Sequence, residues 1–395
     1  MPGDDTGKAP HGPLHGVTVL DLSTVGPAAR CTRLLADYGA SVVKVGPVPG
    51  RGPEPTTPSF FAYGGGRGTK SARFDLSDER GRQAFLDLAG QADVVVESFR
   101  PGVVDRLGIG YDDVRARNPG VVYVSTSGYG QHGPRAGWAG HDIDYLAVGG
   151  YLAMCEPTAD GRPPLPGATI ADAAAGGMQA ALAVCAALFE RERTGAGTRL
   201  DVSVADGVLW LMSLLAEEHL ATGATPRPGH DVLSGRYACY GTYRAGDGRH
   251  LAVGAIEPKF FANLCRALGC EEWIASQYDD EAQPAVRAAF TEAFSRRDRD
   301  AWVAELAGAD TCVAPVLEVA EAVGDPTAVA RGAVSEARHP EHGLIRQLAP
   351  LLAGMPRPTG PVLLPGAGTD TCELLAAAGM AEAQVSALVE AGVVA

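Results

Sequence analysis

The first half of the 395-residue chain alternates short apolar segments with segments of helical spacing, and this alternation limits the folds that it can form. Each apolar segment has the length and the β-branched content of a buried strand. Strands that alternate with helices form a mainly parallel sheet covered by helices, so we expect an α/β protein with a large Rossmann-like domain. Its strands are expected at 17–22, 41–45, 72–76, 93–97 and 121–126, and its first helix at 28–38.

The rest of the chain predicts further helices and a second group of strands. Ser77 is placed to cap the helix that follows the third strand, and Phe85 and Leu88 lie three apart on its buried face. Later helices are expected at 171–193, 205–220, 258–268 and 283–307, strands at 237–243 and 251–253, and two short helices, broken at Gly379, within 371–394.

The length of the chain indicates more than one domain, because a single hydrophobic core rarely serves 395 residues. A loop rich in Pro and Gly at 222–235 is the best place for a crossing into a second domain. We therefore predict a large domain over 1–221 and a smaller α+β domain over 222–330. A final segment, 331–395, is predicted to return to the large domain.

Charge and cysteine content narrow the function. A net charge of −14 argues against nucleic acid or an anionic membrane as a partner. The most apolar stretches, 180–189 and 208–215, are too short to span a bilayer, and residues 1–13 have the composition of a loose tail rather than a targeting peptide. The eight cysteines include no Cys-x-x-Cys pair, so we expect reduced thiols and a cytoplasmic protein.

Three residues that are far apart in the sequence are the best candidates for chemistry. His141 lies in the run Gly-His-Asp-Ile, Asp172 follows thirty-one residues later, and Glu257 precedes Pro258. An imidazole and a carboxylate on opposite sides of one carbon can take a proton from one face and return a proton to the other. This is the minimum equipment of a racemase. A carbon acid beside a thioester carbonyl is weak, so such a site must also stabilise an enolate.

Each residue has an expected role. His141 suits the base, since imidazole titrates near neutral pH, and Glu257 is expected to orient its ring. Asp172 is expected to be the opposing acid or base, while Asp142 either braces the loop or shares a proton. Backbone N–H groups at the helix start near Asp172 are expected to receive the oxyanion. We expect no metal or redox cofactor, because the other histidines lack metal-ligand spacing.

The same residues also have purely structural interpretations. A single histidine in an apolar stretch is more often a hydrogen-bonded structural residue than a catalytic one. Asp172 has the residue type of a helix N-cap, and Glu257 before Pro258 is typical of the start of the next helix. The order and local context of His141, Asp172 and Glu257 together favour catalysis.

The chain resembles the class III CoA-transferase (CaiB/BaiF) superfamily from about Leu14 to its C-terminus. The landmarks are 34–40 (LLADYGA), 97–103 (ESFRPGV), 106–108 (RLG), 127–131 (SGYGQ), 190–195 (ERERTG) and 391–394 (AGVV). The segments 139–143 (AGHDI) and 254–258 (GAIEP) are similar to those of its alpha-methylacyl-CoA racemase branch.

The resemblance implies a fold, an assembly and an active site. It implies a Rossmann-like large domain, a small domain, and two chains interlocked as a homodimer. Each active site would lie between the large domain of one chain and the small domain of the other. His141 with Glu257 would serve one face of the α-carbon and Asp172 the other. In transferase members the aspartate near position 172 instead attacks the thioester, and the histidine is usually missing.

The resemblance also implies a CoA site, in which this chain departs from the pattern. Members usually have a strand that ends in Glu-Arg-Pro or Asp-Arg-Pro, whereas here Gly46 and Pro47 replace the acid and the arginine. The residues left to hold the nucleotide and phosphates are Arg67, Lys70, Ser98, Phe99 and Arg106. Solvated surface cations are the alternative interpretation of the charged ones. The thioester would then be carried either by CoA, bound more weakly, or by the pantetheine of a carrier protein.

Three functions follow from these residues. The first is an isomerase that inverts the α-carbon of a 2-methylacyl or other 2-substituted acyl thioester through an enolate. The second is a CoA-transferase with Asp172 as the nucleophile, against which His141 and Glu257 count. The third is a repurposed or non-catalytic thioester-binding homologue, suggested by Gly46 and Pro47.

Overall fold

The computed structural model describes residues 12–51, 56–355 and 357–395, which form two compact units. The first unit contains Met1–Tyr151, Leu165–Ser213 and Pro326–Ala395, and the second contains Leu152–Pro164 and Leu214–Asp325. The boundaries differ from the predicted ones in three places. Leu152–Pro164 and nearly all of α8 (Ser213–Thr222) belong to the second unit although we expected them in the large domain, and the return to the first unit begins at Pro326 rather than at residue 331. None of the side chains of α8 is buried.

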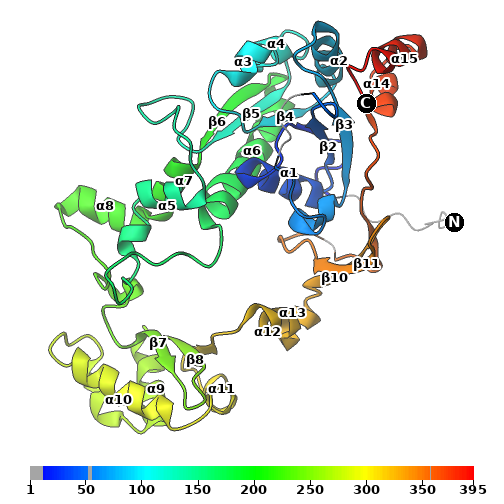
Figure 1. The fold of residues 1–395 in the computed structure, drawn as a ribbon. Helices are drawn as coiled ribbons and strands as arrows, with labels where there is room; N and C mark the ends of the chain where they lie inside the picture. Colours follow the sequence, from blue (N-terminus) through cyan, green and yellow to red (C-terminus); the bar gives the residue numbers. More distant parts are fainter. Residues whose placement is uncertain (1–11, 52–55, 356) are drawn as a thin grey trace. The chain divides into compact units, whose positions relative to one another are not determined.

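In the described part of the first unit, six strands form a parallel sheet in the order β3-β2-β1-β4-β5-β6 (Figure 1). Every neighbouring pair in this sheet is parallel. The strands are β1 (Thr18–Asp21), β2 (Ser41–Gly46), β3 (Thr69–Arg73), β4 (Val94–Glu97), β5 (Val122–Ser127) and β6 (Thr198–Ser203). The α/β architecture predicted from the alternation of segments is therefore present.

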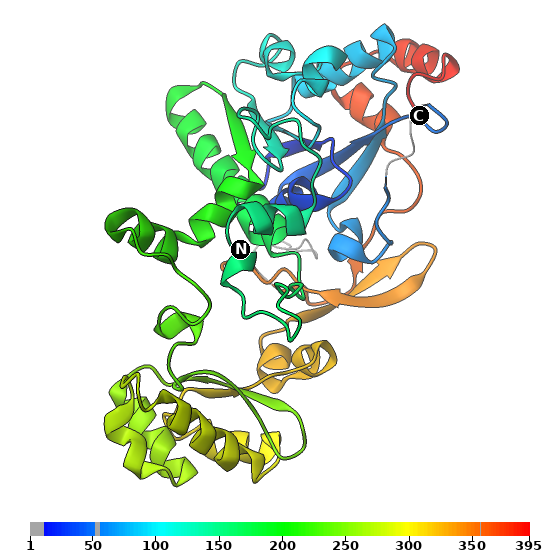
Figure 2. The same cartoon turned by 60° about the vertical axis from the view of Figure 1, so that its left-hand side comes forward.

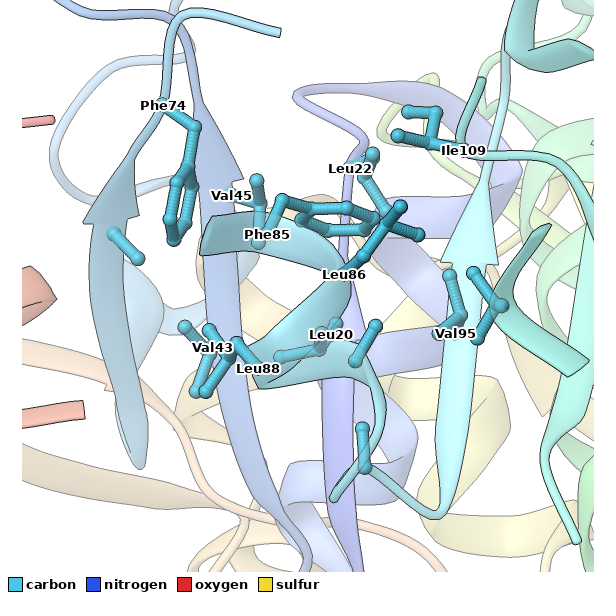
Figure 3. Close-up of a cluster of buried hydrophobic side chains, with 14 of the residues drawn as sticks. Leu20, Leu22, Val43, Val45, Phe74, Phe85, Leu86, Leu88, Val95 and Ile109 are labelled. Atoms are coloured by element: carbon cyan, nitrogen blue, oxygen red, sulfur yellow. The ribbon is translucent and has the colours of Figure 1, made fainter. Parts of the chain in front are cut away.

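The two faces of the sheet carry separate hydrophobic cores, because successive strand residues point to opposite sides. Val19, Val42 and Val94 pack against α1 (Gly26–Asp37) and α6 (Gln179–Thr194). Leu20, Val43 and Val95 face α2 (Glu79–Ala89), which contributes Phe85, Leu86 and Leu88 (Figure 3). The C-terminal helices α14 (Thr371–Ala377) and α15 (Glu382–Glu390) complete this second core through Leu375 and Val385.

Two local predictions were wrong near β3. The strand covers Thr69–Arg73, three residues before the predicted start, because its polar sequence hides an edge strand whose pairing partner is β2. The N-cap of α2 is Asp78, whose carboxylate accepts a hydrogen bond from the Arg80 N–H. The Ser77 hydroxyl instead donates to Asp75.

The predicted helix at 171–193 is present but begins as a π-helix, η3 (Ala171–Met178), before it continues as α6. Gly176 and Gly177 let α1 approach closely, since a Cβ at these positions would lie 2.5 Å from Pro27 Cβ and 2.7 Å from Arg30 Cβ respectively. A π-helix is rare and is most often found at functional sites.

The joined run Ala171–Thr194 is long and apolar enough to cross a membrane by length and composition. This exceeds the span of 180–189 on which the sequence prediction rested. In the structure 44% of its most apolar window is buried, and Ala180, Val184 and Leu188 pack in the core beneath the sheet. One side of the run therefore lies in the hydrophobic core of the first unit, whereas Leu182 and Phe189 on the same run are exposed.

The remaining elements of the first unit are short helices and a hairpin. Strands β10 (Val334–His339) and β11 (Gly343–Leu348) are antiparallel, and β12 (Val362–Leu363) pairs with β10; Figure 2 shows the hairpin in orange. The helices are η1 (Ala62–Gly66), α3 (Val103–Leu107), α4 (Tyr111–Arg115), α5 (Asp142–Val148), α7 (Val204–Leu211) and α13 (Pro326–Ala330).

The second unit is a small α+β domain with its own core. An antiparallel sheet in the order β7-β8-β9 packs against three helices through Leu251, Phe261 and Phe290. Its elements are η2 (Leu152–Met154), α8, η4 (Val232–Ser234), β7 (Tyr240–Arg244), β8 (His250–Gly254), α9 (Pro258–Leu268), η5 (Glu271–Ser276), α10 (Gln283–Ser295), α11 (Arg299–Leu306), β9 (Val313–Pro315) and α12 (Val319–Gly324).

Candidate active site

A cavity of about 360 Å³ lies in the first unit where the carboxyl ends of β1, β4 and β5 meet. The chain continues from β1 to β2 and β3 in one direction and from β4 to β5 and β6 in the other, so the strand order reverses between β1 and β4. Open α/β sheets bind ligands at such a reversal. The segments that line the cavity are 25–27, 98–101, 126–128 and 138–141, with Ala136, Tyr145 and Asp172.

His141 lines this cavity from the N-cap position of α5. Its backbone is extended, and its N–H donates to the Asp144 carboxylate at 2.9 Å, which fixes the start of the helix. The imidazole itself makes no capping hydrogen bond and is exposed. The side chain is therefore available to a substrate, whereas the backbone does the structural work that a capping residue usually performs.

Asp172 lines the same cavity from the first turn of the π-helix, so it is not the N-cap of that helix. Partial burial raises the pKa of its carboxyl group, and the negative charge of Asp142 raises this pKa further. Arg30 and His141 act in the opposite direction. An aspartate whose pKa is raised is a stronger base when ionised and holds a proton more readily, as acid–base catalysis near neutral pH requires.

Asp142 joins the two segments that carry His141 and Asp172. It is buried, and its Oδ1 accepts a hydrogen bond of 2.8 Å from the backbone N–H of Asp172. This contact favours the bracing role over proton sharing. It also occupies one of the N–H groups at the helix start that we expected to receive an oxyanion, so that prediction does not hold for the Asp172 N–H.

Replacement of Asp142 by asparagine should test the charge separately from the brace. The amide oxygen can still accept from the Asp172 N–H, but the negative charge that raises the pKa of Asp172 is gone. The pKa of Asp172 should therefore fall. In a plot of kcat/KM against pH, the decline on the acidic side should then move to lower pH. The profile of kcat/KM against pH measures this shift. If the decline of kcat/KM on the acidic side stayed at the same pH, the charge of Asp142 would not act on the group whose protonation causes that decline.

Tyr145 is a cavity residue that the sequence did not identify. Its hydroxyl donates to the Gly140 carbonyl at 2.5 Å, and burial raises its pKa to about 12. A Cβ on Gly128 would lie 2.2 Å from its ring, and a Cβ on Gly140 would lie 2.8 Å from it. Two glycines thus make room for the ring between the β5 loop and α5. The sequence could have indicated Tyr145, because it follows Asp142 by three residues and such residues lie on the same face of a helix.

Two residues at the end of β5 have buried hydroxyl groups without a partner among the described residues. Thr126 and Ser127 both line it, and neither side-chain oxygen has a hydrogen-bond partner among the described residues. Thr126 is 1% exposed. A buried hydroxyl without a partner is costly, so a polar group of a ligand that reached these oxygens would be stabilised.

The residues predicted to hold CoA do not lie in one place. Ser98 and Phe99 line the cavity, together with Arg100, which is not among the predicted CoA residues. Arg106 lies in α3, outside the residues that line the cavity in the described part. Beneath this loop, Glu97 accepts a hydrogen bond of 2.7 Å from the Phe99 N–H, and burial raises the pKa of Glu97 to about 7.

The two remaining predicted CoA residues are engaged elsewhere in the first unit. Arg67 is buried and pairs with both carboxylate oxygens of Asp37, each at 2.9 Å, so it is not the solvated cation of the alternative interpretation. Lys70 pairs with Glu373 on α14 at 2.7 Å. Neither lines the cavity that contains Asp172, as far as the described residues show. Of the five residues predicted to hold CoA, only Ser98 and Phe99 therefore line the same cavity as His141 and Asp172.

The departure at Gly46 has a structural counterpart. Gly46 of β2 is the register partner of Arg73 on β3, and a Cβ on Gly46 would lie 2.1 Å from Arg73 Nη1. The guanidinium thus occupies the space that a side chain at position 46 would fill. A positive charge is present at the end of β2, but it comes from the neighbouring strand.

Glu257 belongs to the second unit, where it is the exposed N-cap residue of α9. Its side chain makes no capping hydrogen bond, so the structural interpretation explains its position but not its carboxylate. The backbone before it is held at the Ile256 carbonyl, which accepts hydrogen bonds from Gln277 and Tyr278. The pairing of Glu257 with His141 stays a prediction.

Comparison with known proteins places the chain in a family. Residues 14–371 match CoA-transferase family III. Human alpha-methylacyl-CoA racemase is 34% identical over 345 residues, 87% of this chain and 87% of that protein. Acetyl-CoA:oxalate CoA-transferase of Acetobacter aceti is 33% identical over 346 residues, 83% of this chain and 87% of that protein.

Solved structures agree with this assignment. A CaiB/BaiF family protein from Brucella suis superposes with a TM-score of 0.76 at 26% identity, over 93% of this chain and 100% of that one. The match to the family covers most of the chain and includes every strand of the parallel sheet. The chain therefore belongs to CoA-transferase family III.

Proposed function

We propose that the protein is a racemase or epimerase that inverts the α-carbon of a 2-methylacyl, or other 2-substituted acyl, thioester. The observation that carries the proposal is that His141 and Asp172 line one cavity at the strand-order reversal. The charge of His141 also acts on Asp172, which indicates that the two side chains are close. Similarity to human and mouse alpha-methylacyl-CoA racemases, at 34% and 36% identity, supports the same activity.

The proposed reaction moves one proton at each face of the α-carbon. The neutral imidazole of His141 takes the α-proton and becomes imidazolium, while the electrons of the broken C–H bond form the enolate. The protonated carboxyl of Asp172 then gives its proton to the opposite face and becomes a carboxylate. The reverse direction starts from the carboxylate and the imidazolium. Burial and Asp142 raise the pKa of Asp172 toward that of an ordinary imidazole, which makes this exchange easier in both directions.

The unpartnered hydroxyl groups of Thr126 and Ser127 are the proposed donors to the enolate oxygen. They lie in the same cavity as His141 and Asp172 and have no other partner in the described structure. Donors fixed in place before the reaction stabilise developing negative charge without reorganisation.

Thr126→Val should therefore lower kcat by about 10²-fold, the usual cost of one oxyanion donor, because valine keeps the shape of threonine but cannot donate. Thr126 is almost completely buried, so the apolar replacement should leave the free energy of unfolding nearly unchanged. Steady-state kinetics and thermal unfolding measure the two quantities. A kcat equal to that of the wild type would exclude Thr126 as a donor.

The proposed assembly needs a second chain and no added cofactor. We infer that Glu257 of one chain orients His141 of another within an interlocked homodimer in the cytoplasm. The CoA part of the substrate, or a carrier-bound pantetheine, would be held near Ser98 and Phe99, which line the cavity. Neither a metal nor a redox cofactor is required by the proton transfers. No group of three or more metal-binding side chains is found in the described residues.

A class III CoA-transferase with Asp172 as the nucleophile is the alternative. It is favoured by the similarity to acetyl-CoA:oxalate CoA-transferase and to mouse succinyl-CoA:glutarate CoA-transferase, at 33% and 30% identity. That mechanism needs the carboxylate of Asp172 but no proton-transfer group on the α-carbon. The imidazole of His141 in the same cavity would then have no role, which is why we prefer the racemase.

Incubation with a single epimer of a 2-methylacyl-CoA in D₂O tests the two activities together. Exchange of the α-proton for deuterium with loss of optical activity would support the racemase. Movement of CoA to an added free acid, without α-exchange, would support the transferase and contradict our proposal. Absence of both reactions would indicate a repurposed or non-catalytic homologue.

A further inference from the structure

A second cavity, of about 830 Å³, lies in the first unit between α1, η1 and β11. Its charged lining consists of Arg30, Arg33, Arg67 and Arg346 with a single carboxylate, Asp37. Within the lining, four guanidinium groups accompany one carboxylate. The whole chain carries a net charge of −14, so this concentration of positive charge is local and contrary to the overall field.

The buried part of this cluster is crowded with positive charge. Arg67 donates to both oxygens of Asp37 and to the Leu348 carbonyl, and Arg33 shares the same carboxylate. Burial, and then the charge of Arg67, lower the pKa of Arg33 to about 10 despite the opposite effect of Asp37. One carboxylate therefore does not fully compensate two guanidinium groups. An additional anion would be stabilised here by both of them.

Several polar atoms in the cavity wall are buried without a partner. Nε of Arg30 and Nε of Arg33 lack a hydrogen-bond acceptor among the described residues, and so do both ends of the Gln347 amide. Buried donors are nearly always satisfied in folded proteins, by protein, water or ligand. Here the unsatisfied atoms belong to three side chains that line one space.

The rest of the wall is apolar. Leu34 of α1, Phe61 beside η1, and Leu348, Leu351 and Leu352 around the end of β11 face the same space. Phe61 is 61% exposed and Leu348 is 53% exposed, so a hydrocarbon group would bury large surfaces that now face solvent. The chemistry of the wall fits a ligand with an acidic end and an apolar body. A nucleotide, with several phosphates and a polar base, fits it less well.

The second cavity neighbours the proposed catalytic cavity, and residues that line one contact residues that line the other. Arg30 donates to the Thr169 hydroxyl, its guanidinium lies 5.3 Å from the centre of the Tyr63 ring, and its charge acts on Asp172. The Tyr63 hydroxyl accepts from the Gly26 N–H at 3.2 Å, and Gly26 lines the catalytic cavity. Ala173, next to Asp172, lines the second cavity.

We propose that this second cavity binds a carboxylate carried on an apolar chain, and that the carboxylate is the far end of the acyl group whose α-carbon reacts at Asp172. The assignment of the far end rests on the proposed racemase function. The preferred substrates are then thioesters of 2-substituted dicarboxylic acids, bound by Arg30, Arg33 and Arg346 along the cavity. Binding of the carboxylate itself does not require that function.

Calorimetric titration with octanoate, and with octan-1-ol as the uncharged match, tests the site without CoA. Octanoate should bind and octan-1-ol should bind at least tenfold more weakly, as a lost charged hydrogen bond implies. Arg346→Gln should lower the octanoate affinity by a similar factor. Arg346 is exposed on β11, so the variant should fold normally.

Arg338→Gln is the matched control, since Arg338 is exposed on the neighbouring strand β10 and is not among the residues that line the cavity. Its octanoate affinity should equal that of the wild type. Equal binding of octanoate and octan-1-ol, or equal losses in the two arginine variants, would overturn the site. Displacement of octanoate by adenosine 3′,5′-bisphosphate would overturn it too, in favour of a nucleotide site.

A second experiment tests whether the carboxylate is the far end of the acyl group. It measures deuterium exchange at the α-carbon of 2-methyldodecanoyl-CoA and of the matching thioester whose acyl chain ends in a carboxylate. The dicarboxylic substrate should have a KM at least tenfold lower, and Arg346→Gln should remove this difference. If octanoate binds through Arg346 but the two thioesters behave alike, the acyl-end assignment is overturned and the site takes a free acid. If neither thioester exchanges while octanoate still binds, the racemase proposal fails and the carboxylate site stands.

Discussion

His141→Ala is expected to abolish inversion of a 2-methylacyl-CoA, with a fall in rate on the order of 10³-fold or more, because one of two proton-transfer groups is removed. The epimer whose α-proton faces His141 should also lose exchange with D₂O. The other epimer should still exchange slowly through Asp172 but keep its configuration. Following both epimers by NMR and by optical rotation separates these outcomes.

The structure predicts that this variant keeps its fold. The His141 side chain is exposed and makes no capping hydrogen bond, and the backbone N–H that donates to the Asp144 carboxylate is retained in alanine. His132→Ala is the control, because His132 is also exposed but does not line the cavity. Inversion at the wild-type rate in His141→Ala would remove the imidazole from the mechanism, and with it the reason to prefer a racemase.

Asp172→Asn is expected to reduce inversion by a similar factor, because an amide can neither accept nor donate the transferred proton under these conditions. Its exchange pattern should be the reverse of that of His141→Ala. The epimer whose proton faces His141 should still exchange, and the other should not. Two variants with opposite epimer preferences would be strong support for two opposed groups.

The same pair of variants separates the alternative mechanism. A transferase needs the Asp172 carboxylate as a nucleophile, so Asp172→Asn would stop acyl transfer, whereas His141→Ala would leave it nearly intact. Asp112→Asn makes the same chemical change at an exposed position in α4 and should behave like the wild type. Loss of CoA transfer in Asp172→Asn alone, with no α-exchange in the wild type, would contradict the racemase.

The fold was largely predictable where hydrophobic patterning is strong. The strands around Val19, Val42 and Val94 are short apolar runs that are buried on both faces, and these were found within a residue or two. Strand β6 was missed, because Thr198–Ser203 forms an edge of the sheet and alternates polar with apolar residues. The hairpin β10–β11 was missed for a similar reason, since its register depends on a partner strand.

The site was predictable only where residue type and context pointed to chemistry. His141 and Asp172 line one cavity, and the Asp142 carboxylate accepts a hydrogen bond from the Asp172 N–H, while their catalytic roles stay predictions. The hydroxyl of Thr126 was not predicted, since a threonine within a strand looks like any other β-branched residue. Its significance depends on a missing partner, which only tertiary structure reveals.

The guanidinium of Arg73 above Gly46 has a consequence for engineering. A larger side chain at position 46 can enter only if Arg73 rotates away, so the two positions form an epistatic pair. Grafting the usual acid–arginine dipeptide onto the end of β2 is therefore a change at three positions, not two. A single-site graft would place two side chains in one volume.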